Sequence, residues 1–193
     1  SVIFNDEKMA EKNGLEAKHR REIIKGLFLL TPVVSSTFAS FNNTFKDLLN
    51  GDIGMLLIDE AGQANLTNAL GALLRSKMAV VVGDPLQLEP VVTLPVSLNN
   101  AILSYCEAKE EFNLLKSSVQ LRADKAQNIG TYIKGSGESI WVGSPLIVHR
   151  RCANPMFEIS NETTYDDMMI LGRSAASKFA NTNVQTKWID VRS

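Results

Sequence analysis

Short apolar runs and helix-like stretches alternate through the middle of the chain. The run Met55–Ile58 leads without a polar break into two carboxylates, and a second apolar run covers Met78–Val82. Between them, residues 64–75 place leucine and alanine at helical spacing. Runs this short and apolar are typical of strands buried on both faces, and a strand–helix–strand order indicates a parallel sheet. The predicted fold class is therefore α/β, a parallel sheet flanked by helices.

Further elements are predicted on both sides of this unit. The charged stretch from Asp6 to Phe28 predicts a helix that starts late or is interrupted at Asn13–Gly14, and the β-branched run Val33–Thr37 after Pro32 predicts a short strand. The cluster Lys18–Arg21 fits the solvated face of that helix, with a phosphate-contacting patch as the alternative. Other helices are predicted at 40–49, 98–105, 110–115, 119–133 and 155–159, and other strands at 139–142, 145–148, 165–171 and 188–191.

A glycine- and serine-rich turn at residues 135–138 is the clearest boundary signal in the chain, because a new strand pattern follows it directly. The sequence therefore predicts a first lobe over residues 1–138 and the start of a second lobe over residues 139–193.

Composition narrows the classes of protein. A chain of 193 residues with 45% hydrophobic content can bury a core, and a formal net charge of −1 gives no global basic field, so a nucleic-acid contact requires a local patch. The cysteines, Cys106 and Cys152, form no CxxC pair and indicate inert or buried thiols in a reducing compartment. No apolar run has the length of a membrane span and the first residues do not form a signal peptide, so we expect a cytoplasmic protein without a membrane partner.

Two loops carry the candidate chemistry. Asp59 and Glu60 follow an apolar strand at the position where open α/β sheets place their ligands, where they can hold a divalent cation and orient water. The alternative is that they cap the following helix. The second apolar strand leads into Gly83–Val91, in which Gly83 permits a close turn and Gln87 offers a neutral donor and acceptor for a phosphate.

The sequence Asp59-Glu60-Ala61-Gly62-Gln63, followed by Gly83-Asp84-Pro85-Leu86-Gln87-Leu88-Glu89-Pro90-Val91, resembles motifs II and III of superfamily 1 helicases. The similarity is closest to subgroup B, which includes the nonsense-mediated-decay helicase and its bacterial relatives. This resemblance implies a RecA-like P-loop NTPase fold and ATP hydrolysis coupled to movement on single-stranded DNA or RNA.

The resemblance also implies roles for individual residues. Asp59, in the Walker B position, would hold Mg²⁺ through water, and Glu60 would polarise the attacking water. Gln87 would contact the γ-phosphate of ATP and couple its loss to movement. Asp84 and Gln63 lie in the same loops and are assigned to nucleotide binding.

Two other segments fit the family less closely. Ser36 and Thr37 lie where the family contacts the nucleic-acid backbone, although they could equally cap the helix that follows. Residues 145–156 resemble motif IV, whose arginine reaches the γ-phosphate. Arg151 is assigned this role and Arg150 is the alternative, and the spacing to Pro155 exceeds that of the family by one residue.

The phosphate-binding loop GxxxxGK[ST] does not occur in the 193 residues, and neither do motifs V and VI. We therefore expect an internal segment of a larger helicase, whose remaining motor parts are its partner and which neither binds ATP tightly nor hydrolyses it alone. Two alternatives stay open: a non-catalytic module that binds nucleotide or nucleic acid, and another NTPase class with a strand-end acidic pair.

Overall fold

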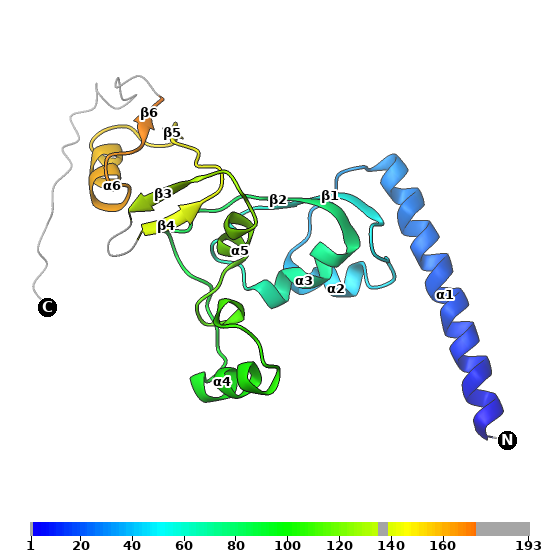
Figure 1. Cartoon of the computed structure of the whole chain (residues 1–193). Coiled ribbons are helices and arrows are strands. Elements are labelled where there is room, and N and C mark those ends of the chain that lie inside the picture. Colours follow the sequence, from blue (N-terminus) through cyan, green and yellow to red (C-terminus); the bar gives the residue numbers. More distant parts are fainter. Residues whose placement is uncertain (1, 135–138, 173–193) are drawn as a thin grey trace, which may run out of the picture. The chain divides into compact units, whose positions relative to one another are not determined.

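The structure is a computed structural model that describes residues 2–134 and 139–172, with side chains from residue 14 onward (Figure 1). The chain divides into two compact units, Ser1–Ala126 and Gln127–Ser193. The boundary at 138 falls in residues 135–138, and the strand expected at 188–191 also lies outside the described residues. The assignment of two motor lobes therefore stays a prediction.

The first unit is built around a parallel strand pair. Its β1 strand (Ile53–Ile58) runs parallel to β2 (Ser76–Val81), with Met55 opposite Met78 and Ile58 opposite Val81. The other elements of this unit are α1 (Val2–Leu30), α2 (Phe38–Thr44), α3 (Leu66–Arg75), α4 (Val96–Tyr105), the 3-10 helix η1 (Glu110–Phe112) and α5 (Val119–Lys125). The predicted strand–helix–strand unit and mixed α/β class are confirmed, whereas a complete RecA-like sheet is not among the described elements.

Strand β1 is covered on one face only, and β2 is exposed from Lys77 to Val80, which corrects the prediction of strands buried on both faces. Ile58 is buried and Leu56 packs against the core, whereas Met55 and Leu57, which alternate with them, are exposed. Alternate side chains of a strand point to opposite faces of the sheet. The apolar run therefore marks a sheet whose second face no described helix of this unit covers.

Helix α3 is the element against which both halves of the core pack. Its N-terminus is capped by Asn65, whose Oδ1 accepts a hydrogen bond from the Thr67 N–H at 3.0 Å. Ala69 of α3 lies in one apolar cluster with Ile58 and Val119. Ala72 of α3 lies in a second cluster, whose other buried residues are Phe41, Phe45 and Leu48. The small alanines allow the helix to lie close to the sheet.

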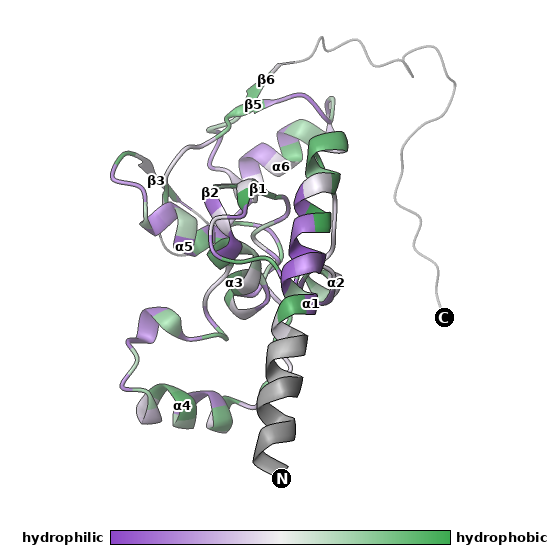
Figure 2. Cartoon of the chain, turned by 90° about the vertical axis from the view of Figure 1, so that its right-hand side faces the viewer, coloured by the Kyte–Doolittle hydropathy of each residue, from purple (hydrophilic) through white to green (hydrophobic). Residues whose placement is uncertain are grey.

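Helix α1 is continuous through Asn13–Gly14, so the predicted interruption is wrong. Only part of the apolar surface of α1 is packed. Ile24 and Phe28 pack against the second cluster, while most of the leucines that make the C-terminal end of α1 hydrophobic are exposed (Figure 2).

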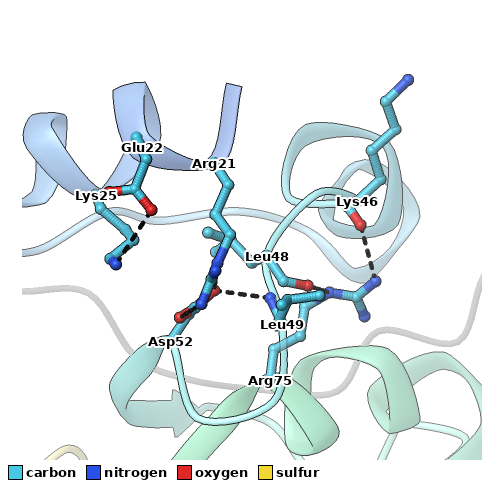
Figure 3. A network of polar contacts seen from close by, with 8 residues as sticks. All are labelled: Arg21, Glu22, Lys25, Lys46, Leu48, Leu49, Asp52 and Arg75. Atoms are coloured by element: carbon cyan, nitrogen blue, oxygen red, sulfur yellow. Dashed lines mark hydrogen bonds and ion pairs between the residues drawn. The ribbon is translucent and has the colours of Figure 1, made fainter. Parts of the chain in front are cut away.

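Two arginines of the basic cluster fasten α1 to the loops around β1. Arg20 donates to Asp47 at 2.7 Å, and Arg21 donates to both oxygens of Asp52 at 2.6 and 2.7 Å (Figure 3). The N–H of Leu49 donates to the same Asp52 carboxylate at 2.7 Å. Both arginines are paired with carboxylates of the fold, which weakens the alternative that this cluster contacts phosphate.

The segment 33–37 is irregular, so the predicted strand there is wrong. Thr37 caps α2, and its Oγ1 accepts a hydrogen bond from the Ser40 N–H at 3.4 Å. The segment pairs with no described strand, and the cap fixes it as the start of a helix. The helix predicted at 40–49 is α2, which ends at Thr44, and Leu49 beyond it is exposed.

The second unit contains β3 (Thr131–Lys134) paired antiparallel with β4 (Ser139–Val142), β5 (Val148–His149) paired parallel with β6 (Ile170–Leu171), and α6 (Met156–Thr164). The helix predicted over 119–133 ends at Lys125, because the sequence from Asn128 to Gly130 breaks it and β3 follows. Cys106 is exposed and Cys152 is half-buried, so neither cysteine is a fully buried thiol, and their inertness stays a prediction.

Candidate functional site

Backbone hydrogen bonds continue beyond the ends of the parallel strands and join the two predicted loops. The Val82 N–H donates to the Ile58 carbonyl at 2.8 Å, and the Ala61 N–H donates back to the Val82 carbonyl at 2.9 Å. The carboxyl ends of parallel strands meet at the same edge of a sheet. The loop Asp59–Gln63 and the loop Gly83–Gln87 therefore begin side by side.

Two glycines let these loops touch. A Cβ on Gly62 would lie 2.5 Å from the Asp84 carbonyl oxygen, and a Cβ on Gly83 would lie 2.6 Å from the Gly62 nitrogen and 2.8 Å from the Ala61 nitrogen. No side chain fits at such distances, so glycine is required at both positions by close backbone approach. The contact gives Gly83 a role in close backbone approach between the loops, and it adds Gly62, which the sequence analysis did not single out.

Asp59 and Glu60 stand at the exposed end of this arrangement. The Glu60 N–H donates to Oδ1 of Asp59 at 3.0 Å, and both residues are exposed. Glu60 has a φ of 53°, in the left-handed region that non-glycine residues rarely adopt. Such backbone conformations cost about 1–3 kcal/mol and are concentrated at functional sites. The helix-cap interpretation of the acidic pair is wrong, because Asn65 caps α3.

Asp84 organises the second loop. One of its carboxylate oxygens accepts the Leu86 N–H at 2.9 Å, and the other accepts a hydrogen bond from Nε2 of Gln87 at 2.8 Å. This bond holds the exposed Gln87 side chain to its own loop. It uses the amide nitrogen of Gln87 and not the side-chain oxygen Oε1. The predicted residues Asp59, Glu60, Gln63, Asp84 and Gln87 thus come from two loops that are in contact.

The donor set fits a magnesium ion that is shared with a phosphate. Among the described residues, no group of three or more His, Cys, Asp or Glu side chains could hold a metal alone. Mg²⁺ is commonly bound by one or two carboxylates, with water and substrate phosphates completing its octahedron. Asp59 and Glu60 could therefore supply the carboxylates that the protein contributes to such a site.

Helix α5 is hydrogen-bonded to the backbone of the first loop and of the residue that follows it. The Val119 N–H donates to the Ala64 carbonyl at 3.0 Å, and the Gln120 N–H donates to the Ala61 carbonyl at 3.1 Å. The side chain of Gln120 donates to Oδ2 of Asp124 at 3.0 Å, and both side chains are buried. The sequence analysis missed this pair. Its i, i+4 spacing places the two residues on one helix face, but nothing in the sequence marks that face as buried.

Ser36 and Thr37 form a hydroxyl cluster with Ser40. Oγ of Ser36 lies 3.1 Å from Oγ of Ser40, and Oγ1 of Thr37 lies 3.0 Å from the same oxygen. All three residues are exposed, and Phe38 beside them packs against the cluster that contains Ile58. The capping role of Thr37 is confirmed, whereas a nucleic-acid contact stays a prediction.

Arg150 and Arg151 lie in the second unit, in a turn that follows β5. The Cys152 N–H donates to Nε2 of His149 at 2.9 Å and closes this turn, and the His149 ring lies 5.5 Å from the Phe157 ring. Both arginines are exposed. Their place relative to the loops of the first unit is not determined, so the role of Arg151 at the γ-phosphate stays a prediction.

Comparison with known proteins identifies one family match. Residues 5–95 match a protein-family model described as an AAA domain, and both candidate loops lie inside the match. The match supports a helicase-like NTPase module of the AAA and P-loop class. No curated protein and no solved structure gives a significant match to the chain. None of the helices in the described part of the chain is both long and apolar enough to span a bilayer.

Proposed function

We propose that this chain supplies half of the nucleotide site of an ATP-dependent superfamily 1 helicase or translocase of subgroup B. The contact between the Asp59–Gln63 and Gly83–Gln87 loops carries the proposal, because it gathers acidic and amide side chains at the carboxyl edge of a parallel strand pair. The family match over residues 5–95 supports the same class of enzyme.

In this proposal Asp59 holds Mg²⁺ through water, and Glu60 accepts a proton from the water that attacks the γ-phosphate. Bound Mg²⁺ neutralises charge on the β- and γ-phosphates. Gln87 donates or accepts a hydrogen bond at the γ-phosphate, and its bond to Asp84 holds it near that position before nucleotide arrives. Gln63 lies exposed on the same loop as Glu60 and takes part in binding the nucleotide.

The other half of the site requires a loop that cradles phosphates, and the 193 residues contain no GxxxxGK[ST] sequence. The proposal therefore assigns that loop to a segment outside this sequence. Arg151 approaches the γ-phosphate from the second lobe, and Ser36 and Thr37 contact the backbone of single-stranded DNA or RNA.

The metal half of the proposal can be tested on the chain itself. Mn²⁺ replaces Mg²⁺ at oxygen sites and broadens nearby amide NMR signals. We expect Mn²⁺ to broaden the amides of Asp59–Gln63 and Gly83–Gln87 selectively. Asp59→Asn should weaken this broadening, because the side chain that holds the hydrated metal through water loses its negative charge.

Glu107→Gln is the matched control, since Glu107 is also an exposed carboxylate with a positive φ, of 48°, but follows α4. This variant should retain the broadening. Equal broadening in wild type and Asp59→Asn would exclude a role of Asp59 in holding the metal.

A further inference from the structure

A buried amide with an unsatisfied oxygen lies directly behind the two loops. Gln120 is 6% exposed, and among the described residues its Oε1 has no hydrogen-bond partner. Most buried polar atoms in proteins are hydrogen-bonded, and one left without a partner costs about 1–3 kcal/mol. This oxygen therefore calls for an explanation beyond packing.

The orientation of the Gln120 amide is fixed by its neighbour. Its Nε2 donates to Oδ2 of Asp124 at 3.0 Å. Reversing the amide would turn Oε1 toward the Asp124 carboxylate, and two acceptors would then face each other while the donor lost its partner. The oxygen is accordingly held on the side away from Asp124.

That side is the second loop of the site. Oε1 of Gln120 lies 3.1 Å from the position that a Cβ on Gly83 would take, so it faces a Cα–H of Gly83. A contact of this kind is only a weak substitute for a hydrogen bond. Gly83 in turn lies against the backbone of Ala61 and Gly62, so Gln120 contacts the second loop where it touches the first.

We propose that Gln120 is a positioning residue of the nucleotide site: it holds Gly83, and with it Asp84 and Gln87, in register with Asp59 and Glu60. The inference rests on the proposed function. The Gln120 side chain is fixed on one side by Asp124, and its backbone N–H is bonded to the Ala61 carbonyl of the first loop. One residue of α5 thus contacts both loops.

The test is the variant Gln120→Met in the 193-residue chain, with Mn²⁺ as the probe. Methionine keeps the length of the side chain and removes its polar atoms. We expect the Mn²⁺ broadening of the Gly83–Gln87 amides to fall about twofold or more relative to that of Asp59–Gln63, as a loop shift of about 1 Å would produce. The melting temperature should fall, because the buried Asp124 carboxylate loses the hydrogen bond from Nε2, so the broadening ratio and not stability reports the positioning role.

A second variant restores the polar pair in reverse. Gln120→Glu with Asp124→Asn keeps an oxygen that can face Gly83 and a hydrogen bond between the two side chains, and it should return the broadening ratio toward that of wild type. The control is Asn99→Leu, which removes another buried amide, bonded to Oδ1 of Asn113 at 2.9 Å, away from the loops. It should lower the melting temperature and leave the ratio unchanged.

The outcomes separate the two proposals. If Gln120→Met keeps the wild-type ratio, or the reversed pair leaves it as low as in Gln120→Met, Gln120 is a packing residue and the positioning role is wrong. If wild type itself shows no selective broadening in either loop, the metal site fails, and the positioning role fails with it.

Discussion

Two polar clusters of the first unit use their charges in opposite ways. In the network near α1, Asp52 accepts hydrogen bonds from Arg21 and Leu49, and Arg75 donates to the carbonyl oxygens of Lys46 and Leu48 (Figure 3). Arg75 also donates to the Gly71 carbonyl. At the ends of β1 and β2, by contrast, Asp59 and Glu60 are exposed carboxylates, and no described cation forms an ion pair with either.

The difference separates charges that stabilise the fold from charges that, in the proposed function, bind a ligand. A carboxylate that is partly buried and bonded to a cation stabilises the folded state, and Asp52 shows this in a pKa lowered to about 2. The loop cluster instead combines exposed carboxylates, a positive φ at Glu60 and a buried oxygen of Gln120 that forms no hydrogen bond with any described residue. Departures from ordinary folding rules that gather in one place indicate a functional site.

The largest expected effect comes from Glu60. In an ATPase-competent protein that contains this segment together with a phosphate-binding loop, Glu60→Gln should lower kcat by about 10²–10⁴-fold, because an amide cannot take the proton of the attacking water. ATP binding should be nearly unchanged. Steady-state hydrolysis and nucleotide titration measure the two quantities, with Glu107→Gln as the control. Hydrolysis at the wild-type rate would assign the base to another residue.

A smaller effect, on the stability of the fold, is expected at Gly83, where the two loops touch. Gly83→Ala would place a Cβ 2.6 Å from a backbone nitrogen of Gly62, so the loops must separate, and we expect a loss of about 1–3 kcal/mol in the free energy of unfolding.

Gly54→Ala is the control for this variant, because Gly54 lies in β1 with nothing within 4 Å of its added Cβ. That substitution should be neutral or stabilise by about 0.5–1 kcal/mol. Urea unfolding followed by circular dichroism measures both. Equal stability of Gly83→Ala and wild type would refute the close contact of the loops.

The smallest effect is expected in the fully paired network, and it depends on pH. The Arg21 hydrogen bonds, aided by the Leu49 N–H and opposed by burial, lower the pKa of Asp52 from 3.8 to about 2. Since the folded-state pKa is depressed, the stabilisation is complete above about pH 4 and is lost as the pH falls toward 2. Asp52→Asn should therefore cost about 1–2 kcal/mol at neutral pH and progressively less below pH 4.

Urea unfolding of wild type and Asp52→Asn between pH 7 and pH 2 measures this difference. A difference that stays constant over the whole range would mean that ionised Asp52 contributes nothing to the stability of the folded state. Asp59→Asn, at an exposed carboxylate outside the network, provides the comparison and should change stability little at any pH.

Local sequence patterns predicted some elements well and others poorly. The strand–helix–strand unit around β1, α3 and β2 was predictable because each element has a strong pattern of its own. Val33–Thr37 was not, since β-branched residues favour a strand only where another strand pairs with them. The helix expected over 119–133 ends at α5 because β4 offers the following residues a partner, as Tyr132 opposite Trp141 illustrates.

The sequence by itself determined the chemistry of the candidate site: the adjacent carboxylates Asp59 and Glu60, the amide Gln87, and the apolar runs that place them at strand ends. Tertiary structure alone decided how they are arranged. The touching of Gly62 and Gly83 and the burial of Gln120 behind them depend on contacts between segments that are distant in the chain. A one-dimensional pattern records the type and spacing of side chains, whereas burial and close backbone approach arise only when separate elements pack against one another.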